Sequence, residues 1–317
     1  MTGTVATATR APAAPFTGTV ELTKHHGLGN DFLVFLSERN PGAPLPAARE
    51  AALWCDRHRG IGADGLLIGF SGEAATRHEL ARHHDATSPD HEGGGPTSTE
   101  MSSIGMRLFN ADGSIAEMSG NGVRCFGHAV AEARGLRSGS LTVTTAAGPK
   151  HLRIEPGSDM AEVLVTVEMG AAGPGPLVPA GAAAVLVAIR HGTVDMGNPH
   201  LVVEDPAPGS VDLTERGGWF ETQFSEGVNV EFVRVVARDR IELTVWERGA
   251  GITAACGTGA CAAVHTARGW GLVDHDVTVV MPGGEARVLL RAGHHVTLIG
   301  PSVLIGRITI TRNTGAP

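Results

Sequence analysis

Stretches in which apolar and polar residues alternate recur along most of the chain, and this period-two pattern predicts β-strands. Residues 20–37 predict two strands separated by a glycine turn at 27–29, and residues 65–70 are apolar throughout and predict a buried strand. The remaining predicted strands are 106–110, 141–146, 150–155, 162–168, 227–236, 241–249, 277–281, 286–291, 295–299 and 303–311.

Three stretches have helical spacing instead. Residues 46–60 carry alanines and the pair Trp54–Cys55 at helical intervals, whereas residues 121–134 and the helix that follows Cys256 are rich in small apolar residues. Strands outnumber helices, and each half of the chain contains one long apolar helix. We therefore expect an α+β fold with two curled, mostly antiparallel, barrel-like sheets, each wrapped around its own central helix.

The two halves of the chain repeat each other. Ser119-Gly120-Asn121-Gly122 matches Cys256-Gly257-Thr258-Gly259 position for position, and a polar residue, Asn110 or Glu247, precedes each motif by nine positions. The other matching segments are 141–148 with 277–284 and 29–34 with 197–202. A duplicated helix start implies one site built from two facing halves.

Both helix starts have chemistry that favours anions. The first N–H groups of a helix have no intrahelical partner, and the helix dipole is positive at this end. Cys256 is therefore a candidate thiol of low pKa. The alternative is a tightly packed core helix in which the cysteines act as small hydrophobic residues, and the repetition argues against it.

Composition and length narrow the classes of protein. The 317 residues suffice for two domains with cores, and a net charge of −8 disfavours nucleic acid and anionic membranes as partners. No apolar run is long enough to span a bilayer. The four cysteines are too scattered for a disulfide framework, so we expect reduced thiols and a cytoplasmic protein.

Two segments are expected to lie outside the folded halves. Residues 1–18 are rich in alanine and threonine, and we expect a disordered tail and not a signal peptide. Residues 71–103 form a histidine-rich insertion whose spacing fits no standard metal-ligand pattern, so we expect a flexible, solvated loop and no metal site.

Taken together, these motifs resemble the diaminopimelate epimerase family across residues 20–312. The resemblance is carried by HGLGNDF (26–32), FNADGS (109–114), SGNGVRCF (119–126), MGNPH (196–200), GVN (227–229), ERGAG (247–251), ACGTGACA (255–262) and PGG (282–284). It implies two pseudo-symmetric domains with the active site between them. The expected boundaries are 19–158 plus 305–317 for the first domain and 159–304 for the second.

The family chemistry implied by this resemblance is inversion at the α-carbon of an amino acid without a cofactor, by one base and one acid on opposite faces. It also implies a homodimer and a small-molecule amino-acid substrate, with LL- and meso-diaminopimelate as the leading candidates. The implied catalytic residues are Cys256, Ser119, Glu247 and His200. The implied substrate-binding residues are Asn30, Asn110, Gly120, Asn121, Asn198, Asn229, Arg248, Gly257 and Thr258.

Ser119 departs from the family pattern, which has a second cysteine there. A hydroxyl titrates several units above a thiol, and a helix N-terminus contributes at most about 2 kcal/mol, so its position alone does not make Ser119 a base equal to Cys256. Three readings stay open: a natural Ser/Cys pair, an engineered Cys→Ser change, or a divergent enzyme that uses one face only. Ile252 and Gly65 also differ from common family residues and bear on the choice of substrate.

Other functions are weighed against this one. An isomerase of the phenazine-biosynthesis type is the competing enzyme class, and epimerisation of another polar amino acid is the competing reaction. A non-enzymatic binding protein is supported only by Ser119, because a pure binder has little use for Cys256. The glycine-rich turns lack the GK[ST] ending of a phosphate-binding P-loop.

Overall fold

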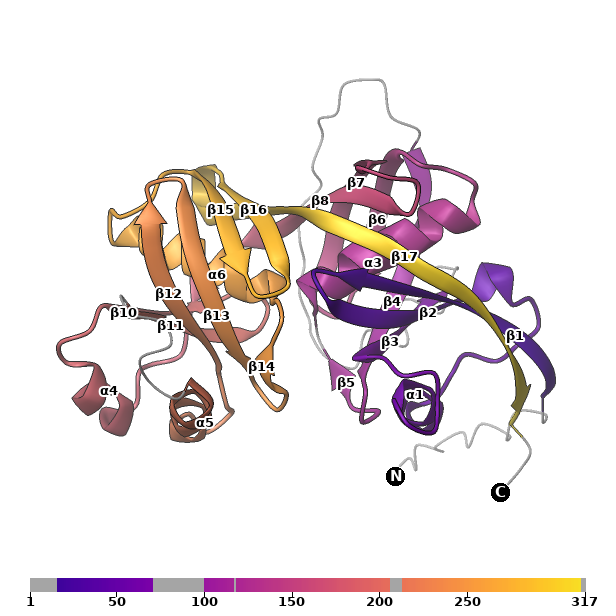
Figure 1. The fold of residues 1–317 in the computed structure, drawn as a ribbon, viewed down its shortest axis with the longest axis horizontal. Helices are drawn as coiled ribbons and strands as arrows, with labels where there is room; N and C mark the ends of the chain where they lie inside the picture. Colours follow the sequence, from indigo (N-terminus) through magenta and orange to yellow (C-terminus); the bar gives the residue numbers. More distant parts are fainter. Residues whose placement is uncertain (1–15, 71–99, 117, 206–212, 315–317) are drawn as a thin grey trace, which may run out of the picture.

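The computed structural model describes residues 16–70, 100–116, 118–205 and 213–314. Most of the predicted tail and of the histidine-rich insertion therefore lies outside the described residues. The chain forms two lobes, and the last strand, β17 (His295–Asn313), leaves the second lobe and runs along the first (Figure 1).

The elements of the two lobes follow one another in chain order. The first lobe contains β1 (Thr17–Gly27), β2 (Asn30–Leu36), η1 (Ser37–Arg39), α1 (Ala48–Cys55), β3 (Gly65–Phe70), β4 (Glu100–Asn110), β5 (Ile115–Ala116), α3 (Gly120–Ala133), β6 (Gly139–Thr145), β7 (Gly148–Pro156) and β8 (Glu162–Ala171). The second lobe contains β9 (Gly173–Pro174), α4 (Ala180–Leu186), β10 (His191–Asp195), β11 (Pro199–Glu204), α5 (Leu213–Gln223), β12 (Asn229–Ala237), β13 (Arg240–Glu247), β14 (Gly251–Thr253), α6 (Gly257–Gly269), β15 (Asp276–Met281), β16 (Gly284–Leu290) and η2 (Ala292–His294).

Strand pairing is the same in both lobes, which confirms the internal duplication. In the first lobe β2 is parallel to β3 and β4 is parallel to β6, and in the second β11 is parallel to β12 and β13 is parallel to β15. The hairpins β4–β5 and β13–β14 precede the two long helices, and the hairpins β6–β7 and β15–β16 follow them. β17 joins the lobes by pairing with β16, then β8 and β1.

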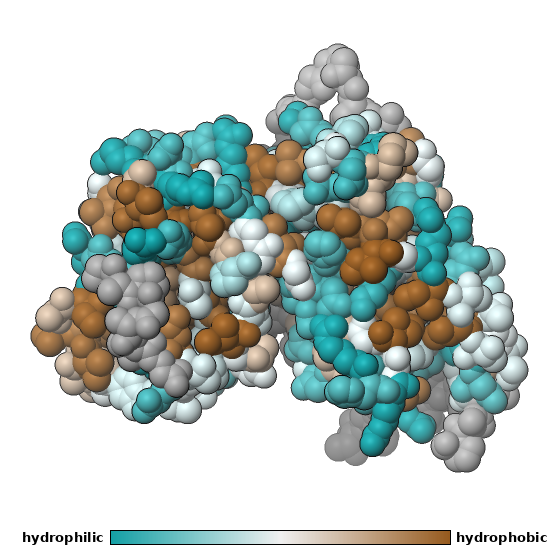
Figure 2. Space-filling view, in the orientation of Figure 1, coloured by the Kyte–Doolittle hydropathy of each residue, from teal (hydrophilic) through white to brown (hydrophobic). Residues whose placement is uncertain are grey.

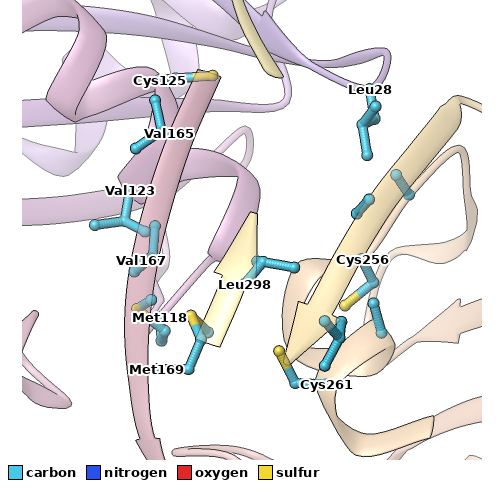
Figure 3. Packing of buried hydrophobic residues seen from close by; sticks show 14 of the residues in the cluster. Leu28, Met118, Val123, Cys125, Val165, Val167, Met169, Cys256, Cys261 and Leu298 are labelled. Carbon is cyan, nitrogen blue, oxygen red and sulfur yellow. The ribbon is translucent and has the colours of Figure 1, made fainter. Parts of the chain in front are cut away.

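The helices α3 and α6 form the centre of the hydrophobic core. Most residues of both helices are buried, including Val123, Phe126, Cys261 and Val264. Leu298 of β17 lies between the packing residues of α3 and those of α6, so one continuous core runs through both lobes (Figure 3). Two smaller apolar clusters pack α1 and the pair α4–α5 against the lobes.

The expected α+β class, with curled sheets around central helices, is confirmed. One predicted detail is wrong: residues 295–299 and 303–311 belong to a single strand, β17. Gly300–Pro301 does not break it, because Pro301 lies after the last pair with β16, at Ile299, and before the first pair with β1, at Val303. A missing N–H is tolerated at such an edge.

The helix α5 was missed because its segment is acidic and contains adjacent glycines. Gly217 and Gly218 lie under the ring of Trp246, and a Cβ on Gly217 would come within 2.6 Å of the Trp246 side chain. Close packing therefore outweighs the low helix propensity of glycine here.

None of the helices in the described ranges is long and apolar enough to span a bilayer.

We propose that the chain divides into two domains with the boundaries expected from the sequence, 19–158 plus 305–317 and 159–304, which differ from the lobes at β8, a strand that pairs with β7 of the first lobe. The repeated pairing pattern supports this division. The pairing of β17 with β1 supports the assignment of the C-terminal residues to the first domain.

Two histidines lie together in the core of the first lobe. The rings of His25 on β1 and His128 on α3 meet edge to face, with their centroids 4.7 Å apart. His128 Nδ1 lies 3.2 Å from the hydroxyl of Ser302. Burial lowers the pKa of His128 to about 4, and burial together with His128 lowers the pKa of His25 well below its ordinary value.

We expect the protein to lose stability as the pH falls from about 6.5 towards about 4. In this range the unfolded chain binds protons at these histidines that the native core excludes, and His128 alone accounts for roughly 3 kcal/mol. His128→Gln should flatten the pH dependence of the urea midpoint, whereas the exposed His58→Gln should not. An equal slope in the wild type and His128→Gln would contradict this origin.

Candidate active site

The starts of α3 and α6 meet between the lobes. A Cβ built on Gly120 would lie 2.8 Å from Gly257 Cα, and a Cβ on Gly257 would lie 2.8 Å from Gly120 Cα. Leu298 packs beside both glycines. The backbones of the two helix starts therefore touch, which requires that neither residue has a side chain.

The molecular surface is indented between the lobes. The space-filling view shows a notch in the outline between the lobes (Figure 2), and β5 and β14 lie on its two sides (Figure 1). These short strands lead into Ser119 and Cys256, respectively. The unpaired N–H groups of the first helical residues, Gly120 and Asn121 on one side and Gly257 and Thr258 on the other, are suited to bind an anion such as a carboxylate.

Ser119 and Cys256 have the same structural role. Each is the N-cap of its helix: Ser119 Oγ accepts the N–H of Gly122 at 3.0 Å, and Cys256 Sγ accepts the N–H of Gly259 at 3.3 Å. Ser119 is half-buried and Cys256 is 5% exposed. The two candidate acid–base groups are thus equivalent in position but differ in solvation.

The expected low pKa of Cys256 is wrong for the protein without ligand. Burial, followed by the nearby charges of Glu247 and Glu231, raises the pKa of the thiol well above its ordinary value, although the Thr258 hydroxyl and the Gly259 N–H act in the opposite direction. The helix start contributes at most about 2 kcal/mol, and the loss of hydration outweighs it. Cys256 is therefore a neutral thiol in this state.

Glu247 at the end of β13 lies close enough to Cys256 for its charge to raise the pKa of the thiol. Glu247 Oε1 accepts the hydroxyl of Thr253 at 2.6 Å. Burial raises the pKa of Glu247, so this carboxylate is a better proton acceptor than one in water. Asn110, the equivalent residue in the first lobe, is exposed and donates to Ser114 Oγ at 2.9 Å in its own turn.

His200 is fully buried on β11 and has a partner at each ring nitrogen. Nδ1 lies 2.7 Å from Glu231 Oε1, and Nε2 lies 2.9 Å from Asn198 Oδ1. The amide of Asn198 also reaches Thr258 Oγ1 at 3.4 Å. The structure thus brings His200, Asn198, Thr258 and Cys256 together.

Three predicted substrate-binding side chains are engaged by the protein itself. Asn229 donates to the carbonyl of Pro199 and accepts the N–H of Arg248, both at 2.9 Å. The exposed guanidinium of Arg248 donates to the carbonyl of Glu226 at 3.1 Å. Asn30 donates to Asp64 Oδ2 at 2.9 Å. Asn229 therefore holds the backbone of Arg248 in place.

Asn121 links the lobes directly, because its side-chain amide donates to the carbonyl of Ala255 at 2.8 Å. Its Oδ1 accepts from the fully buried Arg124 at 2.8 Å, and Arg124 also donates to the carbonyl of Gly120. Arg124 adds positive potential to the helix starts, and burial lowers its pKa.

Sequence reasoning missed Arg124 and Glu231. A charged residue inside an apolar helix or strand, as in GVRCF or NVEFV, was the available signal for both. The remaining cysteines are core residues: Cys55, Cys125 and Cys261 are buried, and burial raises the pKa of each to about 12.

Solved structures with this fold are epimerases and related proteins. A hydroxyproline epimerase from Agrobacterium vitis, solved with bound trans-4-hydroxy-L-proline, superposes with a TM-score of 0.64 at 15% identity and covers 92% of both chains. A predicted epimerase from Pseudomonas aeruginosa gives a TM-score of 0.65 at 15% identity, covering 92% of this chain and 99% of its own. These likenesses show that the chain shares the fold of these proteins.

Sequence comparison identifies the family. The sequence model described as diaminopimelate epimerase matches residues 22–173 and 192–305. The diaminopimelate epimerase of a Synechocystis species is 37% identical, covering 85% of this chain and 90% of the relative. That of Magnetococcus marinus is 36% identical, covering 90% and 94%. The chain belongs to the diaminopimelate epimerase family.

We expect Gly257→Ala to destabilise the protein by about 2 kcal/mol and to lower its epimerase rate, because the new methyl group meets the Gly120 backbone, which has no rotamer with which to move away. Gly269→Ala at the other end of α6 is the matched control. It adds a methyl group in open space and should be neutral or stabilising by up to about 1 kcal/mol. Urea unfolding and initial rates measure both effects; wild-type values for Gly257→Ala would show that the contact is dispensable.

Proposed function

We propose that this epimerase inverts the α-carbon of an amino acid without a cofactor, with Cys256 on one face of the substrate and Ser119 on the other. The observation that carries the proposal is that these two residues cap helix starts that touch at Gly120 and Gly257. A substrate carboxylate bound at the free N–H groups would have one cap on each side of its α-carbon.

The proton steps follow from the groups beside each cap. The thiol proton of Cys256 passes to the neighbouring Glu247 carboxylate, and the resulting thiolate removes the α-proton of the substrate. The N–H groups of both helix starts stabilise the negative charge that develops on the substrate. A proton delivered from the Ser119 side completes the inversion, and the reverse reaction exchanges the two roles.

The reaction is slowest where Ser119 must act as the base. Within the described residues, Ser119 Oγ has one hydrogen bond, from the Gly122 N–H, and none from a carboxylate or imidazole. Its counterpart Cys256 has Glu247 as a proton acceptor. The step on the Ser119 side therefore limits the rate in both directions, because the forward and reverse inversions pass through the same two proton transfers.

Diaminopimelate is the substrate that we propose, because the relatives at 36–37% identity are diaminopimelate epimerases. Arg248, exposed at the end of β13, is suited to bind a distal carboxylate in a bidentate manner. Another polar amino acid is the alternative substrate, and it is distinguished by the same assay.

We also propose that the protein is a homodimer in the cytoplasm. The family resemblance supports a homodimer that acts on a small molecule. The four cysteines are free thiols, which supports a reducing compartment, the cytoplasm.

We expect Ser119→Cys to raise the epimerisation rate by orders of magnitude, because a thiol titrates several units below a hydroxyl. Proton NMR in deuterated water, with LL-, meso- and DD-diaminopimelate and a panel of L- and D-amino acids, reads α-proton exchange and inversion separately. Ser119→Ala is the control that removes the hydroxyl, and Cys256→Ala should abolish exchange.

The outcomes separate the alternatives. Exchange with inversion in the wild type would establish a working Ser/Cys pair and identify the substrate. Exchange of one stereoisomer without inversion would restrict catalysis to the Cys256 face. An unchanged rate in Ser119→Cys would contradict the limiting role of the hydroxyl, and no exchange in either protein would exclude the tested amino acids.

A further inference from the structure

A continuous chain of side-chain contacts connects the buried carboxylate of Glu231 to the thiol of Cys256. Glu231 Oε1 lies 2.7 Å from His200 Nδ1, and His200 Nε2 lies 2.9 Å from Asn198 Oδ1. Asn198 Nδ2 lies 3.4 Å from Thr258 Oγ1, which lies 3.4 Å from Cys256 Sγ. The chain begins on β12, crosses β11 and ends at the start of α6.

The hydrogen-bond donors and acceptors along this chain of contacts give it a direction. Asn198 Oδ1 is an acceptor, so His200 Nε2 donates to it, while Glu231 Oε1 holds the opposite ring nitrogen, Nδ1. Asn198 then donates its amide N–H to Thr258 Oγ1. Because the Thr258 oxygen receives this hydrogen, its own hydroxyl proton is free to point at the sulfur of Cys256. Every donor beyond His200 thus points towards Cys256.

Burial of the Glu231 carboxyl group destabilises the folded protein. The Glu231 side chain is fully buried, and its Oε2 has no hydrogen-bond partner among the described residues. Burial raises its pKa, and His200 opposes that shift. An incompletely satisfied buried carboxylate costs stability, so its presence calls for an explanation.

In the first lobe, different residues occupy the positions equivalent to Glu231 and His200. A Cβ on Gly259 would lie 2.8 Å from Glu231 Oε1, and a Cβ on the equivalent Gly122 would lie 3.4 Å from Leu67 Cδ2. Leu67 therefore occupies the position of Glu231, and by the matching GN motifs Phe32 occupies that of His200. Two apolar residues fill these positions in the first lobe, so the fold itself does not require the buried pair Glu231 and His200.

We propose that Glu231 is a positioning residue for Cys256, which acts by fixing the ring of His200 so that Nε2 holds Asn198 Oδ1 and so that Asn198 and Thr258 direct their hydrogens at the sulfur. This role rests on the proposed function of Cys256 as the base. The donors stabilise the thiolate at the moment it forms, in a site where burial opposes it. The other charged group that faces Cys256 and His200 is Glu247.

The chain of contacts and the negative charge of Glu231 have opposite effects on the pKa of Cys256, which makes the proposal testable. As a nearby negative charge, Glu231 raises the pKa of Cys256, so its neutralisation alone would make the thiol more acidic. If the aligned donors dominate, Glu231→Gln weakens the hold on His200 and on the donors beyond it, and the thiol becomes less acidic. The direction of the change therefore decides between the two.

The experiment is the pH dependence of iodoacetamide labelling at Cys256, followed by peptide mass spectrometry in the full-length protein. We expect Glu231→Gln to slow labelling about tenfold at a fixed pH near 8, as a rise of about one pKa unit requires. Glu231→Asp should restore part of the rate. The buried Cys55, Cys125 and Cys261 serve as internal references that should not change.

A second pair of variants tests the other end of the chain. Thr258→Val removes the hydroxyl at nearly constant volume and should slow labelling as Glu231→Gln does, whereas Thr258→Ser keeps the hydroxyl and should label at close to the wild-type rate. In the NMR assay, Glu231→Gln should lower kcat with little change in KM. Thermal unfolding of each variant verifies that it is folded.

Faster labelling in Glu231→Gln would overturn the proposal and leave Glu231 as a neighbouring charge. Unchanged labelling in Glu231→Gln, or equal labelling in Thr258→Val and Thr258→Ser, would show that the chain does not reach the sulfur. Labelling requires no substrate, so these outcomes remain decisive even if no tested amino acid is epimerised.

Discussion

Contact between Gly120 and Gly257 holds the two helix starts together, and the arrangement of the whole site depends on it. Neither residue has a side chain, so the backbones touch, and Leu298 of β17 packs beside both. The Asn121 amide, which donates to the carbonyl of Ala255, adds a polar link across the same junction. Two helix dipoles that would otherwise repel each other are thereby held with their positive ends at one point, where an anion is needed to balance them.

Burial then determines how the acid–base groups behave at this junction. Hydration of a thiolate is lost at Cys256, and two carboxylates, Glu247 and Glu231, lie close enough to oppose ionisation further. The helix start and the hydrogen bonds from Thr258 and Gly259 recover only part of that cost. A thiol in these surroundings loses its proton when a proton acceptor such as Glu247 is in contact and a substrate brings compensating charge.

The lobes have the same architecture but unequal chemistry. Strand pairing is the same in both, yet the second lobe has Cys256, Glu247, His200 and Glu231 where the first has Ser119, Asn110, Phe32 and Leu67. Ionisable groups have thus been concentrated on one side of the site. An epimerase built in this way has a strong proton acceptor on one face and a weak one on the other, and we infer an unequal use of its two faces.

The sequence alone determined the strands, the two central helices and their duplication, because period-two alternation, glycine turns and N-cap motifs are local signals. It also identified the pair Ser119 and Cys256, since their motifs match residue by residue. It missed α5, because the glycines that weaken this helix locally are needed against Trp246. It did not reveal that Gly120 touches Gly257, that Glu231 meets His200, or that burial raises the pKa of Cys256. These features arise from residues far apart in the chain and from the exclusion of water around them, which only the tertiary structure decides.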